Sequence, residues 1–217
     1  MADVHVTADV SDPPAWEEVV QQVVAELGSV DIAHLNAGVD LDQANLDEIP
    51  LDRYRRIMSI NVDGVVFGMR ALFPVMEKAG GGVVVVTASL GGLVGMPTDP
   101  IYSMTKHAMV GLVRSLGPSM SARGIRVQAV CPGIVETPLV GEERIGLLRE
   151  YGFPLLQADD VAEAVARAIQ SGGSGECWFV QPGRESQPFE FRHVPGPRVE
   201  GGEPGSLPDP LTVTRPT

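Results

Sequence analysis

A tyrosine and a lysine four residues apart, Tyr102 and Lys106, form the first pair in this sequence that could do chemistry. On an α-helix this spacing places the phenol and the ammonium one turn apart on the same face. A free phenol has a pKa of about 10, and a neighbouring cation lowers that pKa because it favours the phenolate. The pair could therefore act as a general acid or base. An exposed tyrosine and lysine that only pack along a helix surface would show the same spacing.

Ser89 stands 13 residues before Tyr102, directly after the apolar run of residues 83–88. This run is rich in β-branched residues and predicts a strand that is buried on both faces. Open parallel sheets bind ligands at the carboxyl ends of their strands, so Ser89 is a candidate site residue. The alternative is a serine that only forms a turn or caps a helix.

The elements that must position these side chains alternate between strands and helices. Residues 16–27 carry an apolar stripe at helical spacing that ends before Gly28. Strands that are separated by helices of this length are typical of parallel crossovers, so we expect a single α/β domain with a doubly wound, Rossmann-like parallel sheet. Further helices are expected at 51–78, 101–123 and 159–170, and strands at 4–8, 30–35, 83–88, 125–131 and 177–180.

Composition narrows the class of protein. The chain has 217 residues, 44% of them hydrophobic, and a net charge of -12, which disfavours nucleic acid and anionic membrane surfaces as partners. No basic segment followed by an apolar one opens the chain, and we expect a cytoplasmic protein. The two cysteines, Cys131 and Cys177, lie in strand-like runs, which favours buried thiols over a disulfide. The four histidines show no metal-ligand spacing, so no metal site is expected.

Several further motifs surround Tyr102 and Lys106, and their order and approximate spacing resemble the short-chain dehydrogenase/reductase family. The resemblance covers about residues 4–183. Each motif alone is a weak signal, but the joint pattern is specific. In chain order the motifs are Asp9-Val10, Asn36-Ala37-Gly38, Asn61, Ser89, Tyr102 with Lys106, Pro132-Gly133 and Thr137.

The resemblance implies an oxidoreductase that uses NAD or NADP on an alcohol or ketone. Tyr102 would be the general acid or base, Lys106 would lower its pKa and hold the nicotinamide ribose, and Ser89 would bind the substrate oxygen. Asn61 would hold a water in the proton path behind Lys106. For the cofactor, Asp9 and Val10 would border the adenine, Asn36, Ala37 and Gly38 would pass under it, and Pro132, Gly133, Ile134 and Thr137 would contact the carboxamide.

Plainer interpretations stand beside these roles. Gly38 and Gly133 could be turn glycines, and Asn61 could be an ordinary polar residue of a helix. The resemblance also implies a variable lid over the substrate at residues 139–156. Its side chains Ile145, Leu147, Leu148, Tyr151 and Phe153 favour an apolar alcohol or ketone, although they could instead pack on the body. The resemblance further implies a homo-oligomer, either a dimer or a tetramer, assembled through the long helices at 51–78 and 101–123.

The start of the sequence departs from the family. No Gly-x-x-x-Gly-x-Gly turn precedes Asp9, so the resemblance implies an N-terminally truncated domain without the usual pyrophosphate site. In the family's strand order, 3-2-1-4-5-6-7, two strands would lie between residues 4–8 and 30–35. We therefore expect a gap of roughly 14 Å between those two segments. Residues 30–35 would then form an exposed edge.

Three interpretations follow from this departure. The first, which we prefer, is an oxidoreductase whose full sequence begins upstream of Met1. The second is a non-catalytic remnant that pairs its open edge with a partner, and the third is an inactive fragment. The chain as printed is expected to bind neither NAD nor NADP at millimolar concentration and to self-associate through the edge at 30–35.

The end of the sequence has a different composition. We divide the chain into a domain at 1–182 and a tail at 183–217 that is rich in Pro and Gly and expected to be flexible. Residues 189–191 are the exception, because their two phenylalanines could pin the start of the tail to the body or to a partner subunit.

Overall fold

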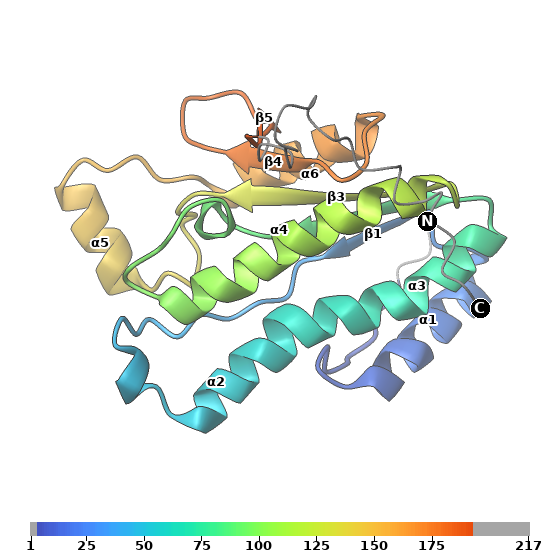
Figure 1. The fold of residues 1–217 in the computed structure, drawn as a ribbon, viewed down its shortest axis with the longest axis horizontal. Coiled ribbons are helices and arrows are strands. Elements are labelled where there is room, and N and C mark those ends of the chain that lie inside the picture. Colours follow the sequence, from blue (N-terminus) through green and yellow to red (C-terminus); the bar gives the residue numbers. More distant parts are fainter. Residues whose placement is uncertain (1–3, 193–217) are drawn as a thin grey trace, which may run out of the picture.

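The computed structural model of the protein describes residues 4–192, and its centre is one five-stranded sheet (Figure 1). The strands are β1 (Ile32–Leu35), β2 (Gly82–Thr87), β3 (Ile125–Pro132), β4 (Cys177–Val180) and β5 (Gln187–Pro188). They lie in the order β1-β2-β3-β4-β5, and the first four are parallel. This arrangement confirms the predicted Rossmann-like parallel sheet.

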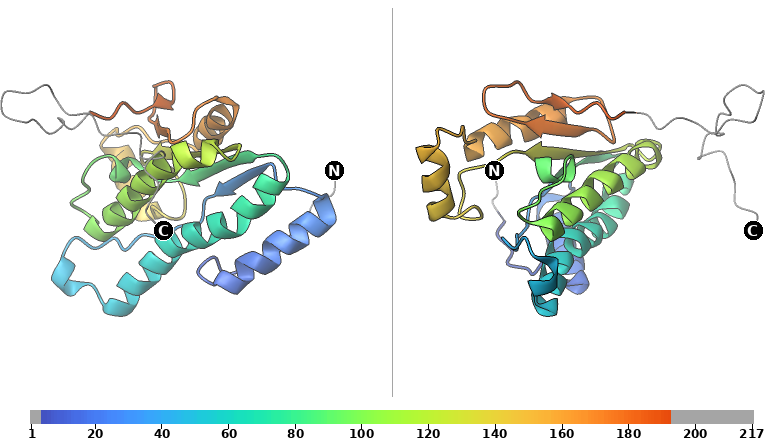
Figure 2. Two further views of the ribbon diagram at one scale, coloured as in Figure 1. Left: turned by 45° about the vertical axis from the view of Figure 1, so that its right-hand side comes forward. Right: turned by 60° about the vertical axis from the view of Figure 1, so that its left-hand side comes forward.

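Helices cover both faces of the sheet, as Figures 1 and 2 show. In β2, Val84 and Val86 face a core shared with α3 (Gly64–Lys78) and α4 (Pro100–Ser121), whereas Val83 and Val85 face a second core under α6 (Ala158–Gln170). Because successive strand residues point to opposite faces, the valine run must be apolar throughout. Both cysteines are buried and unpaired. The helices are α1 (Pro13–Leu27), α2 (Leu51–Met58), α3 (Gly64–Lys78), α4 (Pro100–Ser121), α5 (Glu142–Glu150) and α6 (Ala158–Gln170), with short turns η1 (Leu46–Glu48), η2 (Ser59–Asp63) and η3 (Leu90–Gly92).

The segment from α2 through η2 to α3 is one continuous helical stretch, Leu51–Lys78, as the sequence predicted. By length and composition it is apolar enough to cross a membrane. However, the side chains of Met69, Leu72 and Met76 lie in the core against the sheet. Core helices of soluble folds can have this same composition, and packing against the sheet accounts for part of the apolar residues of this stretch.

The N-terminal segment differs from the prediction. Residues 4–8 form no strand and are mostly exposed, so the expected first strand is wrong. Instead α1 packs on α3, where a Cβ on Gly68 would lie 2.9 Å from the Trp16 ring. Only Val20 of α1 is fully buried, and within residues 4–192 β1 pairs with β2 alone. Ile32 of β1 is 52% exposed, which agrees with the predicted open edge.

The start of the predicted tail belongs to the folded body. Residues of β5 pair antiparallel with β4, and the Phe189 N–H donates to the Cys177 carbonyl at 2.7 Å. The Arg114 guanidinium lies 3.7 Å from the ring centroid of Phe191, which packs against the main core. The expected flexible tail therefore does not begin at residue 183. The remainder of that prediction, 193–217, lies outside the described residues.

Replacing Phe191 by alanine tests this attachment. The change removes a half-buried ring and its contact with Arg114, so the free energy of unfolding should fall by about 2 kcal/mol. Urea denaturation measures the difference. The control is Tyr151→Ala, which removes an aromatic ring that is 82% exposed and should change stability by less than about 0.5 kcal/mol. Equal effects of the two variants would mean that Phe191 does not hold the segment in place.

Candidate active site

Helix α4 carries the two side chains that the sequence singled out. Lys106 is only 4% exposed, and its Nζ donates to the Thr87 carbonyl at the end of β2, at 2.8 Å. The same nitrogen lies 5.5 Å from the ring centroid of Tyr102, so the expected proximity is confirmed. Burial lowers the pKa of Lys106 from its ordinary value of 10.5 to about 8. Lys106 is therefore a buried amine and not a surface partner of Tyr102.

The pKa of Tyr102 shifts in the direction opposite to the one expected. Burial raises it, a hydrogen bond with Ser89 opposes the rise, and the nearby carboxylates Asp40 and Asp99 add to it. The lysine does not offset these effects, because its own charge is destabilised by burial and is engaged by Thr87. Tyr102 therefore keeps its proton at neutral pH, which suits a proton donor better than a base.

Ser89 reaches this site because the turn after β2 packs closely on α4. At Gly92 of η3, a Cβ would lie 2.5 Å from the Lys106 carbonyl oxygen, so only glycine allows the approach. Ser89 caps η3 by accepting from the Gly91 N–H at 3.0 Å, as the plainer interpretation predicted. The hydroxyl also lies near enough to the Tyr102 phenol to oppose the rise in the pKa of Tyr102, so Ser89 belongs to the site as well. The two interpretations of Ser89 are compatible.

Asn61 occupies the π-helical turn η2 between α2 and α3 and is 1% exposed. Its Oδ1 accepts from the Val39 N–H and its Nδ2 donates to the Val39 carbonyl, both at 2.8 Å. Nδ2 also donates to the Thr105 hydroxyl at 3.1 Å. Asn61 thus fastens the loop after β1 to α4, and π-turns of this kind are frequent at functional sites.

The loop after β1 lies beside the lysine. A Cβ on Gly38 would be 3.4 Å from both Asn61 Oδ1 and Lys106 Nζ, so this backbone passes between the two side chains. The Thr87 hydroxyl donates to Asn36 Oδ1 at 2.9 Å and lies 2.8 Å from His34 Nε2. Sequence reasoning singled out neither Thr87 nor His34, and burial lowers the pKa of His34.

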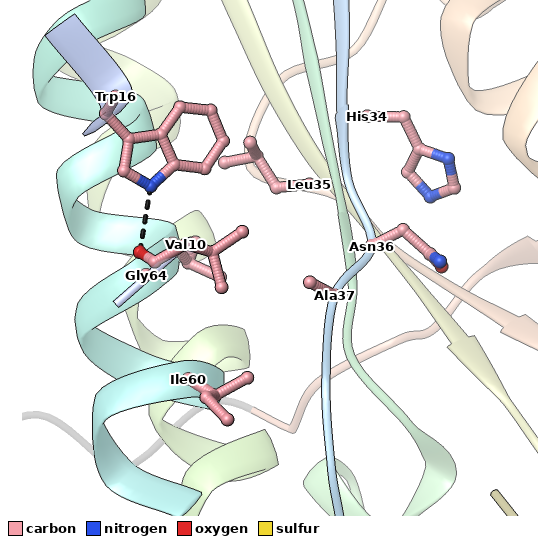
Figure 3. A pocket seen from close by; sticks show the side chains of 9 residues that line it. Val10, Trp16, His34, Leu35, Asn36, Ala37, Ile60 and Gly64 are labelled. Carbon is pink, nitrogen blue, oxygen red and sulfur yellow. Dashed lines mark hydrogen bonds between the residues drawn. The ribbon is translucent and has the colours of Figure 1, made fainter. Parts of the chain in front are cut away.

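A hollow of about 150 Å³ lies at the open side of β1, and Figure 3 shows the side chains that line it. It is mostly apolar, and Val10 enters it from the segment before α1. The Trp16 indole N–H donates to the Val10 carbonyl at 2.9 Å, and a Cβ on Gly64 would lie 3.0 Å from that carbonyl oxygen. Val10 and Asn36 therefore line the same hollow, and the expected gap of roughly 14 Å between residues 4–8 and 30–35 stays a prediction. The lining residues are Val10, Trp16, His34, Leu35, Asn36, Ala37, Ile60, Gly64 and Val65.

Asp9, next to Val10, is exposed and turns the chain into α1. Its Oδ1 accepts from the Ser11 N–H at 2.8 Å and from the Ser11 hydroxyl at 2.7 Å. The backbone hydrogen bond is the largest cause of a lowered pKa of Asp9. In this structure the Asp9 carboxylate has a local role, and Val10 alone of the pair lines the hollow.

The segment after β3 lies on the other side of Ser89. The Pro132 carbonyl accepts from the Ser89 hydroxyl at 3.5 Å, and the Gly133 N–H donates to the Val180 carbonyl at 3.0 Å. The Ile134 carbonyl accepts from the Leu156 N–H at 2.9 Å, and the Thr137 carbonyl from the Val140 N–H at 3.1 Å. These backbone bonds hold the segment at the carboxyl end of β3, next to that of β2.

The predicted lid contains α5, which sequence reasoning did not identify as a helix. Ile145 is buried, whereas Leu147 is 53% and Phe153 46% exposed, so the lid residues divide between packing and exposure. Near its base, a second hollow of about 480 Å³ separates the loop after β1 from Pro138 and Leu139. Within residues 4–192, no three His, Cys, Asp or Glu side chains are grouped as metal ligands.

A comparison with models of protein families shows the family to which the chain belongs. Residues 2–147 match the family model described as short chain dehydrogenase. The chain belongs to the short-chain dehydrogenase family. Membership agrees with the parallel sheet and with the site between β2 and α4.

Individual relatives give the extent of the likeness. Cyclohexanol dehydrogenase of Acinetobacter sp. is 30% identical over 77% of this chain and 67% of its own length. Levodione reductase of Leifsonia aquatica is 35% identical over 61% of this chain and 50% of its own. The chain thus spans between half and two-thirds of the length of these curated relatives.

A solved structure agrees with the fold. The 3-ketoacyl-(acyl-carrier-protein) reductase of Brucella melitensis, complexed with NADH, aligns with a TM-score of 0.77 and 30% identity. The alignment covers 82% of this chain and 77% of the reductase.

Proposed function

We propose that the protein is an NAD(P)-dependent oxidoreductase that interconverts an alcohol and a ketone, with Tyr102 as its acid/base residue. The observation that carries the proposal is the junction of β2 and α4, where the Tyr102 phenol, the Ser89 hydroxyl and the buried Lys106 amine meet. Three polar groups of these types, at the carboxyl end of a parallel strand, can bind and protonate a carbonyl oxygen.

The protonated state of Tyr102 supports a role as proton donor. Because its pKa is raised, the phenol is protonated at neutral pH and can donate to a ketone oxygen as negative charge develops there. The Ser89 hydroxyl, which lies near Tyr102, can donate to the same oxygen. In the oxidation direction the alcohol proton passes to the phenolate form of Tyr102, which becomes more populated as the pH rises toward its raised pKa.

The residues around Lys106 fit a nicotinamide cofactor, which supplies the hydride when bound. An ammonium has three donors, and within residues 4–192 only the Thr87 carbonyl accepts from Lys106. The remaining donors can hold ribose hydroxyls. The hollow at Val10, Asn36 and Ala37 can take the adenosine end, Gly38 passes between the two, and residues 132–137 can contact the carboxamide. Asn61 would position a water behind Lys106.

A cyclic secondary alcohol or its ketone is the substrate class that we propose. Two relatives carry names of this class, cyclohexanol dehydrogenase and levodione reductase. Leu139 lines the second hollow, and Leu147 and Phe153 are further exposed apolar side chains of the lid that could cover an apolar ring. The hollow is also lined by the charged residues Asp40, Asp52, Arg53 and Arg56, which could contact polar groups of the substrate.

The test uses the protein as it is made in its natural host. With cyclohexanol and NAD or NADP, we expect reduced nucleotide to form, followed by its absorbance, and the reverse reaction to occur with cyclohexanone. Ser89→Ala should lower kcat by about 10²-fold, as the loss of an oxyanion donor does elsewhere. A preparation that binds nucleotide but oxidises no member of a panel of cyclic, linear and aromatic alcohols would overturn the proposal.

The 217-residue chain by itself provides a separate measurement. No Gly-x-x-x-Gly-x-Gly turn precedes Asp9 in the printed sequence, and contacts to nicotinamide and ribose are expected to offset only part of the several kcal/mol lost in association. We expect NAD and NADP to bind no tighter than about 1 mM in titration calorimetry. Micromolar binding would show that residues 4–192 already hold a sufficient site.

The open edge of β1 supports a second candidate function, pairing with another chain. Ile32 is 52% exposed on this edge, and unpaired strand edges recruit further strands. We propose a homo-oligomer of a cytoplasmic protein, assembled through this edge or through the long helices. Size-exclusion chromatography tests it, and a concentration-independent monomer would exclude it.

A further inference from the structure

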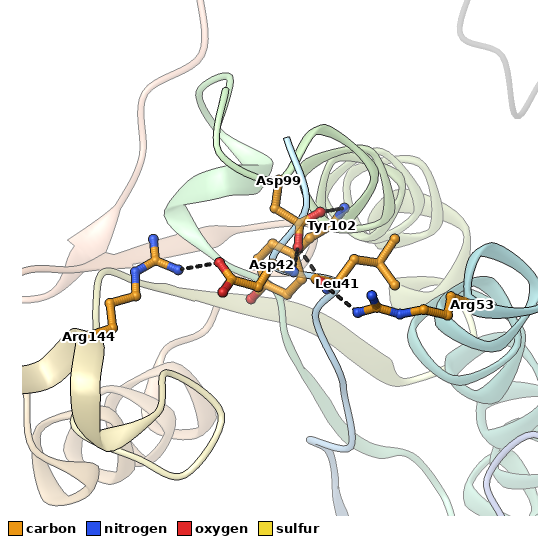
Figure 4. Close-up of polar contacts among 6 residues, drawn as sticks. All are labelled: Leu41, Asp42, Arg53, Asp99, Tyr102 and Arg144. Carbon is orange, nitrogen blue, oxygen red and sulfur yellow. Dashed lines mark hydrogen bonds and ion pairs between the residues drawn. The ribbon is translucent and has the colours of Figure 1, made fainter. Parts of the chain in front are cut away.

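A single buried carboxylate joins two parts of the site that lie far apart in the sequence. Asp99 is 2% exposed and precedes α4. Its Oδ1 accepts from the Tyr102 N–H at 2.9 Å, and its Oδ2 accepts from the Leu41 and Asp42 N–H groups, both at 2.8 Å (Figure 4). The carboxylate therefore holds the catalytic helix and the loop after β1 together.

The loop has a backbone that depends on this contact. Asp42 has a φ of 46°, the one positive value among the non-glycine residues of the described chain. Its turn aims two successive N–H groups at one anion, a conformation that persists only when its surroundings hold it. The Arg53 guanidinium donates to the Leu41 carbonyl at 2.6 Å, and Arg144 of α5 pairs with the Asp42 carboxylate at 3.3 Å.

A helix cap alone would not need this arrangement. Capping requires one oxygen that accepts from the first turn, which Oδ1 provides at Tyr102. The second oxygen binds amides that are 58 and 57 residues away in the chain. Those amides belong to the same loop as Gly38, which passes beside Lys106, so the contact fixes the loop relative to the phenol.

We propose that Asp99 is a positioning residue, which sets the loop of residues 38–42 against the first turn of α4 so that a bound substrate and cofactor face the Tyr102 hydroxyl. The inference rests on the proposed function. A displacement of about 1 Å at a reacting centre can lower turnover a hundredfold, so a carboxylate that touches neither substrate nor cofactor can still govern the rate.

Asp99→Ser separates the two roles of the carboxylate. Serine is a good helix cap and can still accept from the Tyr102 N–H, but it is too short to reach the loop. We expect kcat to fall by about 10- to 100-fold with KM changed much less, since only the geometry of the reacting groups is altered. Hydrogen exchange should lose protection at Leu41 and Asp42 and retain it at Tyr102.

The controls keep the outcomes distinct. Asp160→Ser removes a carboxylate that accepts from a backbone N–H at the start of α6, that of Gln157 at 2.7 Å, in an exposed place away from the site, and should leave kcat within about twofold. Asp99→Asn keeps the shape and half of the acceptors, and its kcat should lie between those of wild type and Asp99→Ser. If Asp99→Ser does not fold, this variant carries the test.

Two results would overturn the inference. One is protection at Leu41 and Asp42 that persists without the carboxylate. The other is lost protection with unchanged kcat, which would reduce Asp99 to a structural cap. Absence of turnover in the wild type would instead refute the proposed function, and the exchange measurement would still decide whether Asp99 holds the loop.

Discussion

Replacing Tyr102 by phenylalanine is expected to lower kcat at least about a hundredfold, because general acid–base catalysis contributes a factor of this size or more. Phenylalanine keeps the ring against its neighbours, including Ile101 and Ile57 of the same apolar cluster. Cofactor affinity and stability should therefore change little, and the loss should appear in kcat and kcat/KM alike. Steady-state kinetics with the alcohol that supports turnover measures both.

The matched control is Tyr54→Phe. Tyr54 packs against the same apolar cluster as Tyr102, so its loss of a hydroxyl tests the general effect of removing a phenol there. Its kcat should stay within about twofold of wild type. Near-normal turnover in Tyr102→Phe would show that Tyr102 is not the proton donor. The proposed reaction would then lose its main support.

The raised pKa of Tyr102 adds a condition to this prediction. In the reduction direction the protonated phenol is the active form. Burial is the largest cause of the raised pKa of Tyr102, and it keeps the phenol protonated at neutral pH. Ketone reduction should therefore show no fall with rising pH near neutrality that can be assigned to Tyr102. A fall that disappears in Tyr102→Phe would mean that its pKa is lowered when the cofactor binds.

The segments with a clear period were predicted closely. The strand at 177–180 has the predicted bounds, and the helix expected at 159–170 is observed as Ala158–Gln170. In such segments the periodic pattern itself selects the buried face, so little depends on distant residues. The strand predicted at residues 4–8 is not formed, because β-branched residues make a strand only where a neighbouring strand is available to pair.

The site residues that act through their side chains could be predicted from the sequence, whereas those that act through the backbone could not. Tyr102, Lys106 and Ser89 could be found because their residue types are needed for the chemistry. Thr87 binds Lys106 through its carbonyl, a group that every residue carries, so no sequence signal marks it. Asp99 followed by Pro100 does mark a helix start, but its bonds to Leu41 and Asp42 could not be read from that pair.

The direction of the pKa shift of Tyr102 was predicted wrongly for a related reason. Spacing predicted that the ammonium lies near the phenol, and the 5.5 Å distance confirms it. Spacing carries no information on burial, however, and burial is the largest effect on both groups. The electrostatics of this pair follow from the fold around it and not from its place on the helix.

Replacing Lys106 by methionine is expected to remove activity while stabilising the protein. A pKa lowered from 10.5 to about 8 means that the folded state holds the charged amine at a free-energy cost. Each unit by which the pKa is lowered corresponds to about 1.4 kcal/mol, so the cost of the charged amine is roughly 3 kcal/mol at pH 7. The bond to Thr87 returns about 1 kcal/mol, so Lys106→Met should be more stable by about 2 kcal/mol at pH 7.

The stability difference between the wild type and Lys106→Met should depend on pH in a direction set by the lowered pKa of Lys106. Below pH 8 the lysine is protonated in both states, and the wild type bears the full cost. Between about 8 and 10.5 the folded protein has released the proton and the unfolded chain still binds it, so the stability of the wild type rises with pH. The advantage of Lys106→Met should therefore shrink across this window. Urea denaturation at a series of pH values measures it.

Lys78→Met is the control, because Lys78 is exposed at the end of α3 and its loss should change stability by less than about 0.5 kcal/mol. Cofactor affinity should fall about 10- to 100-fold in Lys106→Met alone, the usual size for a lost hydrogen bond from a charged donor. A variant that is less stable than wild type by the same amount at every pH would mean that the buried amine carries no charge cost. Unchanged cofactor affinity would mean that its free donors do not face the ribose.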